Sequence, residues 1–123
     1  MIVLDYRDKR PIYEQIVDRI QTLILSGALE PDEKLPSVRA LAVDLSINPN
    51  TIQRAYSELE REGFIYSVKG RGNFVRMDEK MLARQQEKLL SEVRKQAKVW
   101  REQKISCRSI INIIEEVYEG YPE

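Results

Sequence analysis

Apolar residues recur at helical spacing in the first thirty positions and predict a helix. Pro11 suits the first helical position, where its fixed φ and missing N–H are tolerated. Gly27 is typical of a residue that follows a helix C-terminus, and residues 29–35, which contain Pro31, are expected to form a connector. The apolar residues of this helix should form one wall of a small core, and they are Ile12, Ile16, Ile20, Leu23 and Ile24.

The next apolar pattern predicts two short helices joined by a tight turn. Ser37 is a good N-cap for the first, and Asn48 followed by Pro49 predicts the start of the second. Only Ser46 and Ile47 lie between them, which is the spacing that a helix-turn-helix requires. The apolar positions of the two helices are Val38, Leu41, Ala42 and Leu45, then Ile52, Ala55, Tyr56 and Leu59.

The other side of the second of these helices is polar and carries Asn50, Gln53, Arg54 and Ser57. Asn and Gln side chains can pair with adenine, Arg with guanine, and Ser with a phosphate oxygen. Taken alone, such a face is more often the solvated side of an amphipathic helix. Its position directly after a helix and a turn favours a helix that reads the major groove of DNA.

A basic hairpin follows this helix. Gly63 predicts the helix end, and residues 64–68 and 73–76 predict two paired strands. The turn Lys69-Gly70-Arg71-Gly72 has glycines that permit positive φ and close approach to a phosphate. A nucleotide-phosphate loop would instead precede a helix. These elements predict a mainly α fold with a small β-wing, a winged helix-turn-helix.

The last third of the chain predicts a helical dimerisation hairpin. Residues 77–104 form one long amphipathic pattern with Leu82 and Ala97 on its apolar side, and Ser106 and Gly120 predict the ends of a shorter helix. The shorter helix is apolar over more than one face, so we expect a two-fold homodimer. The residues expected at its interface are Leu89, Val93, Trp100, Ile110, Ile113, Ile114 and Val117.

Composition narrows the function. The chain has 20 basic and 20 acidic residues, but residues 34–76 hold seven basic and four acidic ones, a local surplus suited to phosphates. With one cysteine and no histidine, we expect no enzyme activity, no metal site and no cofactor. Cys107 is expected to be a buried filler beside Ile110 and Ile111.

No apolar run is long enough to span a membrane, which takes about 20 residues, and the start of the sequence does not resemble a secretory signal. We therefore expect a cytoplasmic protein without membrane contact.

Several motifs in the right order resemble the N-terminal domain of GntR-type bacterial transcription regulators. They are PIYEQI from Pro11, LPSVRALA from Leu35, NPNTIQRAY from Asn48 with Leu59 and Gly63, and GRGNFV from Gly70, which together cover about the first 76 residues. The resemblance implies DNA contacts by Ser37 and Arg39, by the groove-reading turn, and by the wing tip. The residues of the last two groups are Asn50, Thr51, Gln53 and Arg54, then Lys69, Gly70 and Arg71. A surface arginine or an ion pair with Asp44 is the alternative interpretation of Arg39.

Two helices alone after the wing resemble the YtrA branch of that family. The implied organisation is a DNA-binding domain at residues 1–76 and a dimerisation region at residues 77–123. The resemblance implies a sequence-specific repressor beside a transporter operon, acting on palindromic double-stranded DNA with half-sites about 34 Å apart. A small-molecule effector is expected between subunits or against the winged domain. The alternative is a winged-helix module that binds protein or RNA without operator specificity.

Overall fold

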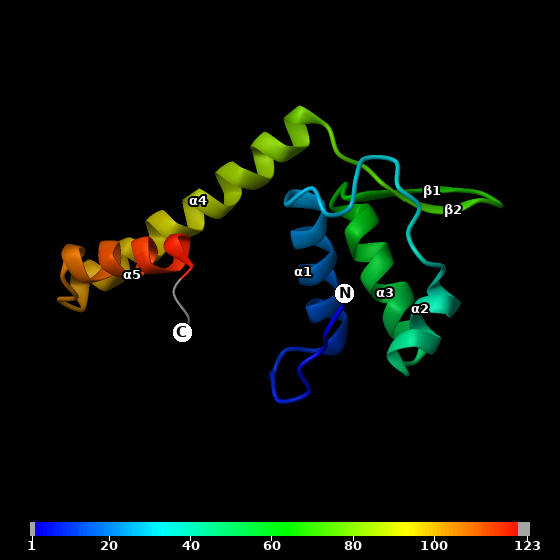
Figure 1. Ribbon diagram of the computed structural model, residues 1–123, viewed down its shortest axis with the longest axis horizontal. Helices are drawn as coiled ribbons and strands as arrows, with labels where there is room; N and C mark the ends of the chain where they lie inside the picture. The colour runs from blue at the N-terminus through cyan, green and yellow to red at the C-terminus, as the bar shows by residue number, and fades with distance from the viewer. Residues whose placement is uncertain (1, 121–123) are drawn as a thin grey trace. The chain divides into compact units, whose positions relative to one another are not determined.

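The computed structural model describes residues 2–120, which form helices and a two-stranded antiparallel sheet (Figure 1). The chain divides into two compact units, Met1–Leu82 and Ala83–Glu123. The expected fold class, mainly helical with a small wing, is confirmed. The elements are α1 (Ile12–Leu25), α2 (Val38–Leu45), α3 (Pro49–Arg61), β1 (Ile65–Val68), β2 (Gly72–Val75), α4 (Glu79–Glu102) and α5 (Cys107–Glu119).

Helix α1 supplies the predicted wall of the core. It begins one residue later than expected, because the ψ of Pro11 is 148° and this residue is therefore the N-cap rather than the first helical residue. The carbonyl oxygen of Pro11 accepts the N–H groups of Glu14 and Gln15. After the helix, Gly27 has a φ of 84°, which confirms it as the residue that stops α1.

Helices α2 and α3 form the predicted helix-turn-helix. The Ser37 hydroxyl accepts the N–H of Ala40, and the Asn48 side chain accepts that of Asn50, so both predicted N-caps are confirmed. Ser46 turns the chain with a φ of 55°, and Ile47 packs against the core from the turn.

The core of the first unit lies where α1 and α2 pack against α3. The predicted stripe of α3 is confirmed, since each of its four members is at most 2% exposed. Phe64 and Val75 extend the core to the wing, and Met81 adds the first turn of α4. The principal buried side chains are Ile16, Ile20, Ile24, Ile52, Tyr56, Leu59, Phe64, Ile65, Val75 and Met81.

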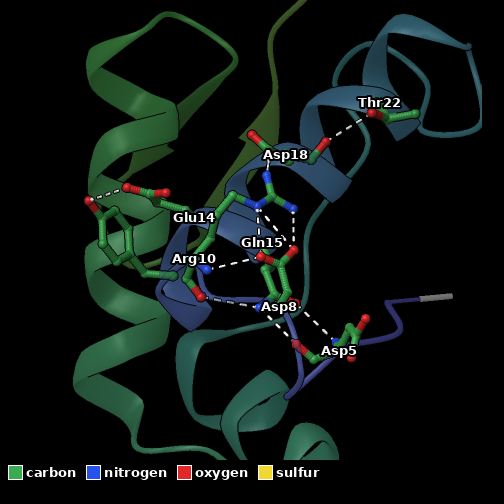
Figure 2. Close-up of polar contacts among 8 residues, drawn as sticks. Asp5, Asp8, Arg10, Glu14, Gln15, Asp18 and Thr22 are labelled. Carbon is green, nitrogen blue, oxygen red and sulfur yellow. Dashed lines mark hydrogen bonds and ion pairs between the residues drawn. The ribbon is translucent and has the colours of Figure 1, made fainter.

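The buried amide of Gln15 attaches the segment before α1 to that helix, as Figure 2 shows. Its Oε1 accepts the N–H of Asp5 at 3.0 Å, and its Nε2 donates to the Asp5 carbonyl oxygen at 3.0 Å.

The Arg10 guanidinium pairs with the carboxylates of Asp8 and Asp18. The interactions with Arg10 lower the pKa of Asp8, chiefly through the side-chain hydrogen bond from Arg10.

The wing is a hairpin in which Val68 pairs with Gly72. The predicted end of the first strand at Val68 is confirmed, while its predicted start and both predicted ends of the second strand were wrong by one residue. The N–H of Phe64 donates to the Leu59 carbonyl and closes the end of α3, so β1 begins after it. Gly72 lies opposite Val68 and belongs to β2, so the turn consists of residues 69–71.

The connector before α2 is more than a loop, which the sequence did not indicate. The Asp32 N–H donates to the Val75 carbonyl at 2.7 Å, and the Leu35 N–H donates to the Asn73 carbonyl at 2.9 Å. Lys34 forms an isolated antiparallel bridge with Phe74. The connector therefore runs along the free edge of β2 and fixes the wing to the start of α2.

The second unit is built from most of α4 together with α5. The prediction of one helix over residues 77–104 was too long at both ends. The Asp78 carboxylate accepts the N–H of Met81 at 2.7 Å and so caps α4 after Met77. At the other end Lys104 has a φ of 66°, and the N–H of Ile105 returns to the Trp100 carbonyl, which ends α4 at Glu102.

The caps predicted for α5 are confirmed. The Ser106 hydroxyl accepts the N–H of Ser109, and Gly120 is left-handed at the C-terminus. No residue of α5 is buried. Cys107 is exposed, so its prediction as a buried filler was wrong. The reason is that α4 and α5 alone do not bury the first turn of α5.

Within residues 2–120 no helix has the length and apolarity needed to cross a bilayer.

Candidate nucleic-acid interface

The outward side of α3 carries the predicted reading residues. Asn50, Gln53 and Ser57 are exposed, and Thr51 is half-buried. The Gln53 amide donates to the Ser57 hydroxyl at 3.1 Å, which aligns two polar side chains one helical turn apart. This side presents amide and hydroxyl donors and acceptors that match base edges and phosphates.

Arg54 differs from its neighbours because it contacts α1. Its Cζ lies 3.8 Å from the centre of the Tyr13 ring, a cation–π contact. The guanidinium therefore rests on an aromatic face at the edge where α1 and α3 meet. The sequence reading missed this role of Tyr13. The signal available was an aromatic residue beside the first apolar residue of α1.

The start of α2 presents Ser37 and Arg39, and both are exposed. Ser37 uses its oxygen to cap the helix, while its hydroxyl hydrogen remains able to donate to an anion. Among residues 2–120, the Arg39 side chain has no hydrogen bond or ion pair, so the alternative pairing with Asp44 is not formed.

Tyr56 connects α3 to this corner of the molecule. Its hydroxyl donates to the Pro36 carbonyl at 2.7 Å, one residue before the cap of α2. Burial raises the pKa of Tyr56 to about 12, so the hydroxyl remains a donor at neutral pH. The sequence predicted that Tyr56 is buried. It did not reveal that its polar end positions Ser37 relative to α3.

The wing turn places Lys69, Gly70 and Arg71 in solvent. The Arg71 N–H donates to the Val68 carbonyl at 2.9 Å, and Gly70 has a φ of 78°, which favours glycine at this turn position. The two basic side chains flank a glycine with no Cβ. Such a tip can approach a phosphate closely.

Acidic side chains near the end of α3 are engaged within the protein. Glu58 pairs with Arg61, and the hydrogen bond from that guanidinium lowers the pKa of Glu58. Glu60 accepts from the Ser67 hydroxyl at 3.0 Å, and Glu62 accepts from the Gln21 amide at 2.7 Å. These three carboxylates lie toward the C-terminal end of α3, away from the N-terminal turns that carry the predicted reading residues. In the described part of the chain, no three Cys, Asp or Glu side chains gather as a metal ion would require.

The predicted interface residues of the second unit fall into two groups. Trp100 and Ile110 are half-buried and line a hollow of about 300 Å³ together with Ala97. The others are apolar side chains between 46% and 59% exposed, namely Leu89, Val93, Ile113, Ile114 and Val117. Within the second unit this apolar surface is open.

Comparison with known proteins gives the family. Residues 12–75 match the family described as "Bacterial regulatory proteins, gntR family". The chain is 51% identical over 75 residues to the HTH-type transcriptional repressor YtrA of Bacillus subtilis (strain 168), an alignment that covers 61% of this chain and 58% of YtrA. The chain thus aligns with somewhat more than half of that relative.

Solved structures extend the likeness to both units. A GntR family transcriptional regulator from Listeria monocytogenes has 36% identity and a TM-score of 0.77, covering 92% of this chain and 98% of that one. The DNA-binding domain of AraR, solved in complex with operator ORR3, has 33% identity and a TM-score of 0.53, covering 59% of this chain and 88% of that one. The family and the fold are those of transcription regulators rather than enzymes, and the chain belongs to the gntR family of bacterial regulatory proteins.

Proposed function

We propose that this protein is a homodimeric, sequence-specific repressor that binds palindromic double-stranded DNA. The N-terminal part of α3 enters the major groove, and the exposed side chains of Asn50, Gln53 and Arg54 read base edges. Six other side chains contact the sugar-phosphate backbone of the DNA, namely those of Ser37, Arg39, Thr51, Ser57, Lys69 and Arg71. Gly70 lets the wing approach the DNA backbone closely. This arrangement divides the chain in function into residues 1–76 for DNA and 77–123 for assembly.

One observation carries the DNA-binding role: basic groups on the predicted contact surfaces are free, while the carboxylates at the C-terminal end of α3 are engaged within the protein. Within residues 2–120, Arg39, Lys69 and Arg71 have no ion pair or side-chain hydrogen bond. By contrast, Arg10 and Arg61 are paired with carboxylates. Cations that are not neutralised within the protein release counterions when they meet DNA phosphates.

The open apolar surface of the second unit supports a dimer formed by α4 and α5. Leu89 and Val93 of α4 are about half exposed, as are Ile113, Ile114 and Val117 of α5. Covering such side chains contributes roughly 25 cal/mol per Å² of apolar area. A second copy supplies the same surface, and two-fold pairing presents two recognition helices to a palindrome.

An effector would bind against the winged domain, where a hollow of about 770 Å³ lies between α1, the connector and α2. Its walls are apolar and include Leu23 and Leu41, and Lys34 and Asp44 lie among its polar lining. A hollow of this size and composition suits a small organic molecule. The similarity to the YtrA repressor supports the proposal that this protein represses transcription. The regulated genes would be a transporter operon, and the protein would act in the cytoplasm.

Selection of bound fragments from a random pool of DNA duplexes tests the proposal. We expect enrichment of an inverted repeat whose half-sites are separated by about one helical turn. Affinity for the selected duplex should fall steeply between about 50 and 200 mM salt. Failure to enrich any sequence, together with salt-insensitive binding to proteins or preference for RNA, would instead favour the interaction-module alternative.

A further inference from the structure

A groove of about 380 Å³ lies between the connector and the wing. All of its charged lining residues are basic, namely Lys34, Lys69 and Arg71. Ser37, the cap of α2, also lines it. We call this feature the wing groove, and its full lining is Lys34, Leu35, Ser37, Ser67, Val68, Lys69, Gly70, Arg71, Gly72 and Asn73.

The backbone holds Lys34 firmly at the wing groove. Lys34 bridges to Phe74, the next residue donates its N–H to the Asn73 carbonyl at 2.9 Å, and the preceding Glu33 carbonyl accepts the Val75 N–H at 2.9 Å. Lys34 therefore lies in a short strand-like segment at the edge of the sheet, where its Cα position is set by β2.

The side chain of Lys34 lies across Gly72. A Cβ added at Gly72 would be 3.2 Å from Lys34 Cε, which is closer than ordinary contact. Gly72 also has a φ of 120°, a conformation that favours glycine. Because Gly72 has no side chain, there is room for the aliphatic part of Lys34 to lie over it and reach the groove.

The charges of the three cations around the groove are not neutralised by other side chains in the described part of the chain. Among residues 2–120, the side chains of Lys34, Lys69 and Arg71 make no hydrogen bond or ion pair. The Glu60 carboxylate accepts a hydrogen bond from the hydroxyl of Ser67, a lining residue, and not from any of the three cations. Three like charges line one hollow, and an anion that enters it would offset their mutual repulsion.

We propose that the wing groove holds a DNA backbone phosphate and that Lys34 is its anchoring residue. The inference rests on the proposed DNA-binding function and adds a contact for which the sequence motifs gave no indication. Lys34 contributes a positive charge from the edge of the sheet, and Lys69 and Arg71 contribute theirs from the wing turn. The Ser37 hydroxyl donates a hydrogen bond to a phosphate oxygen. The contact fixes the wing on the duplex without reading sequence.

The test compares Lys34→Gln, Lys34→Arg and wild type on a selected operator duplex and on a scrambled duplex, each over a range of salt. We expect Lys34→Gln to weaken binding to both duplexes by the same factor. It should also reduce the slope of log affinity against log salt by about 0.9, the value for one phosphate contact. Lys34→Arg should retain the wild-type slope.

Lys98→Gln is the matched control, since it removes the same charge from an exposed position of α4. A wild-type salt slope for Lys34→Gln, with wild type itself binding DNA, would refute the phosphate contact and leave the proposed function intact. Loss confined to the operator duplex would also refute it, because it would make Lys34 a base-reading residue. A wild-type protein that binds neither duplex would instead refute the proposed function.

Discussion

The guanidinium of Arg54 rests on the face of Tyr13, with Cζ 3.8 Å from the ring centre, so a residue of α1 orients a candidate reading residue of α3. A cation–π contact at an exposed site contributes about 0.5–1 kcal/mol. The same contact restricts the rotamers that Arg54 explores. In the proposed complex with DNA we therefore expect Tyr13 to act on recognition through Arg54.

Replacing Arg54 with Ala should relax preference at particular base pairs, at a cost of about 1–3 kcal/mol if the contact to guanine is bidentate. Tyr13→Leu should reduce the same preference by a smaller amount, because Arg54 remains but loses its support. The measurement is the affinity for the operator and for its single-base variants.

The double variant separates direct from indirect action. We expect it to lose no more preference than Arg54→Ala alone, since Tyr13 acts through Arg54. An equal loss of affinity on every duplex for Arg54→Ala would assign this residue to the backbone and would refute its reading role.

Gln53 and Lys69 should differ in the kind of binding they support. Gln53→Ala removes an amide from the outward side of α3, and we expect weaker discrimination at one or two positions of each half-site. Lys69→Ala removes a charge from the exposed wing turn, and affinity should fall by similar factors on all duplexes with a shallower salt slope. Titrations of both variants against matched operator and scrambled duplexes check this, and a sequence-dependent loss for Lys69→Ala would contradict it.

The helix-turn-helix could be predicted almost to the residue because local chemistry determines it. Ser37, Asn48 and Pro49 mark helix starts through their own side chains, and the apolar stripe of α3 is set by helical spacing. The strand-like edge at Lys34 and the stack between Arg54 and Tyr13 could not be predicted in this way. Both join segments far apart in the chain, and neither leaves a periodic pattern.

The exposed state of Cys107 shows the limit of reading apolar patterns from one chain. A cysteine beside Ile110 and Ile111 suggested burial, yet α4 and α5 together leave Cys107 in solvent and bury no residue of α5. The sequence specified how much apolar surface α5 carries. Whether that surface is covered depends on a partner, which periodicity within one chain does not describe.

Tyr56 makes stability sensitive to alkaline pH. Burial raises its pKa from 10.0 to about 12, so its stabilising contribution is complete below pH 10 and is lost as the pH rises through 12. Tyr56→Phe should cost about 1 kcal/mol at pH 8, because the bond to the Pro36 carbonyl is removed. The difference between wild type and variant should then shrink as the pH increases above 10.

Urea denaturation at pH 8 and at about pH 11 measures this difference directly. Tyr118→Phe is the control, since Tyr118 is 88% exposed and its removal should leave the unfolding free energy unchanged at both pH values. A constant gap between wild type and Tyr56→Phe across this range would show that the Tyr56 hydroxyl titrates alike in the folded and unfolded states.

Charges placed on the apolar side of α5 should separate the dimer. Ile113 and Ile114 are 56% and 46% exposed, and a second copy would cover them in the proposed assembly. Replacing both with Glu would bury two carboxylates without partners, which costs several kcal/mol per ion. Sedimentation velocity should therefore show monomers, and affinity for a full palindrome should fall to that for an isolated half-site.

Asn112→Glu provides the control because it adds a carboxylate to an exposed polar position of the same helix. This variant should remain dimeric, since its charge can stay in solvent while the apolar side of α5 is covered. Dimers that persist in the Ile113 and Ile114 variant would place the interface outside α5. Monomers in both variants would mean that net charge, rather than burial of these isoleucines, controls assembly.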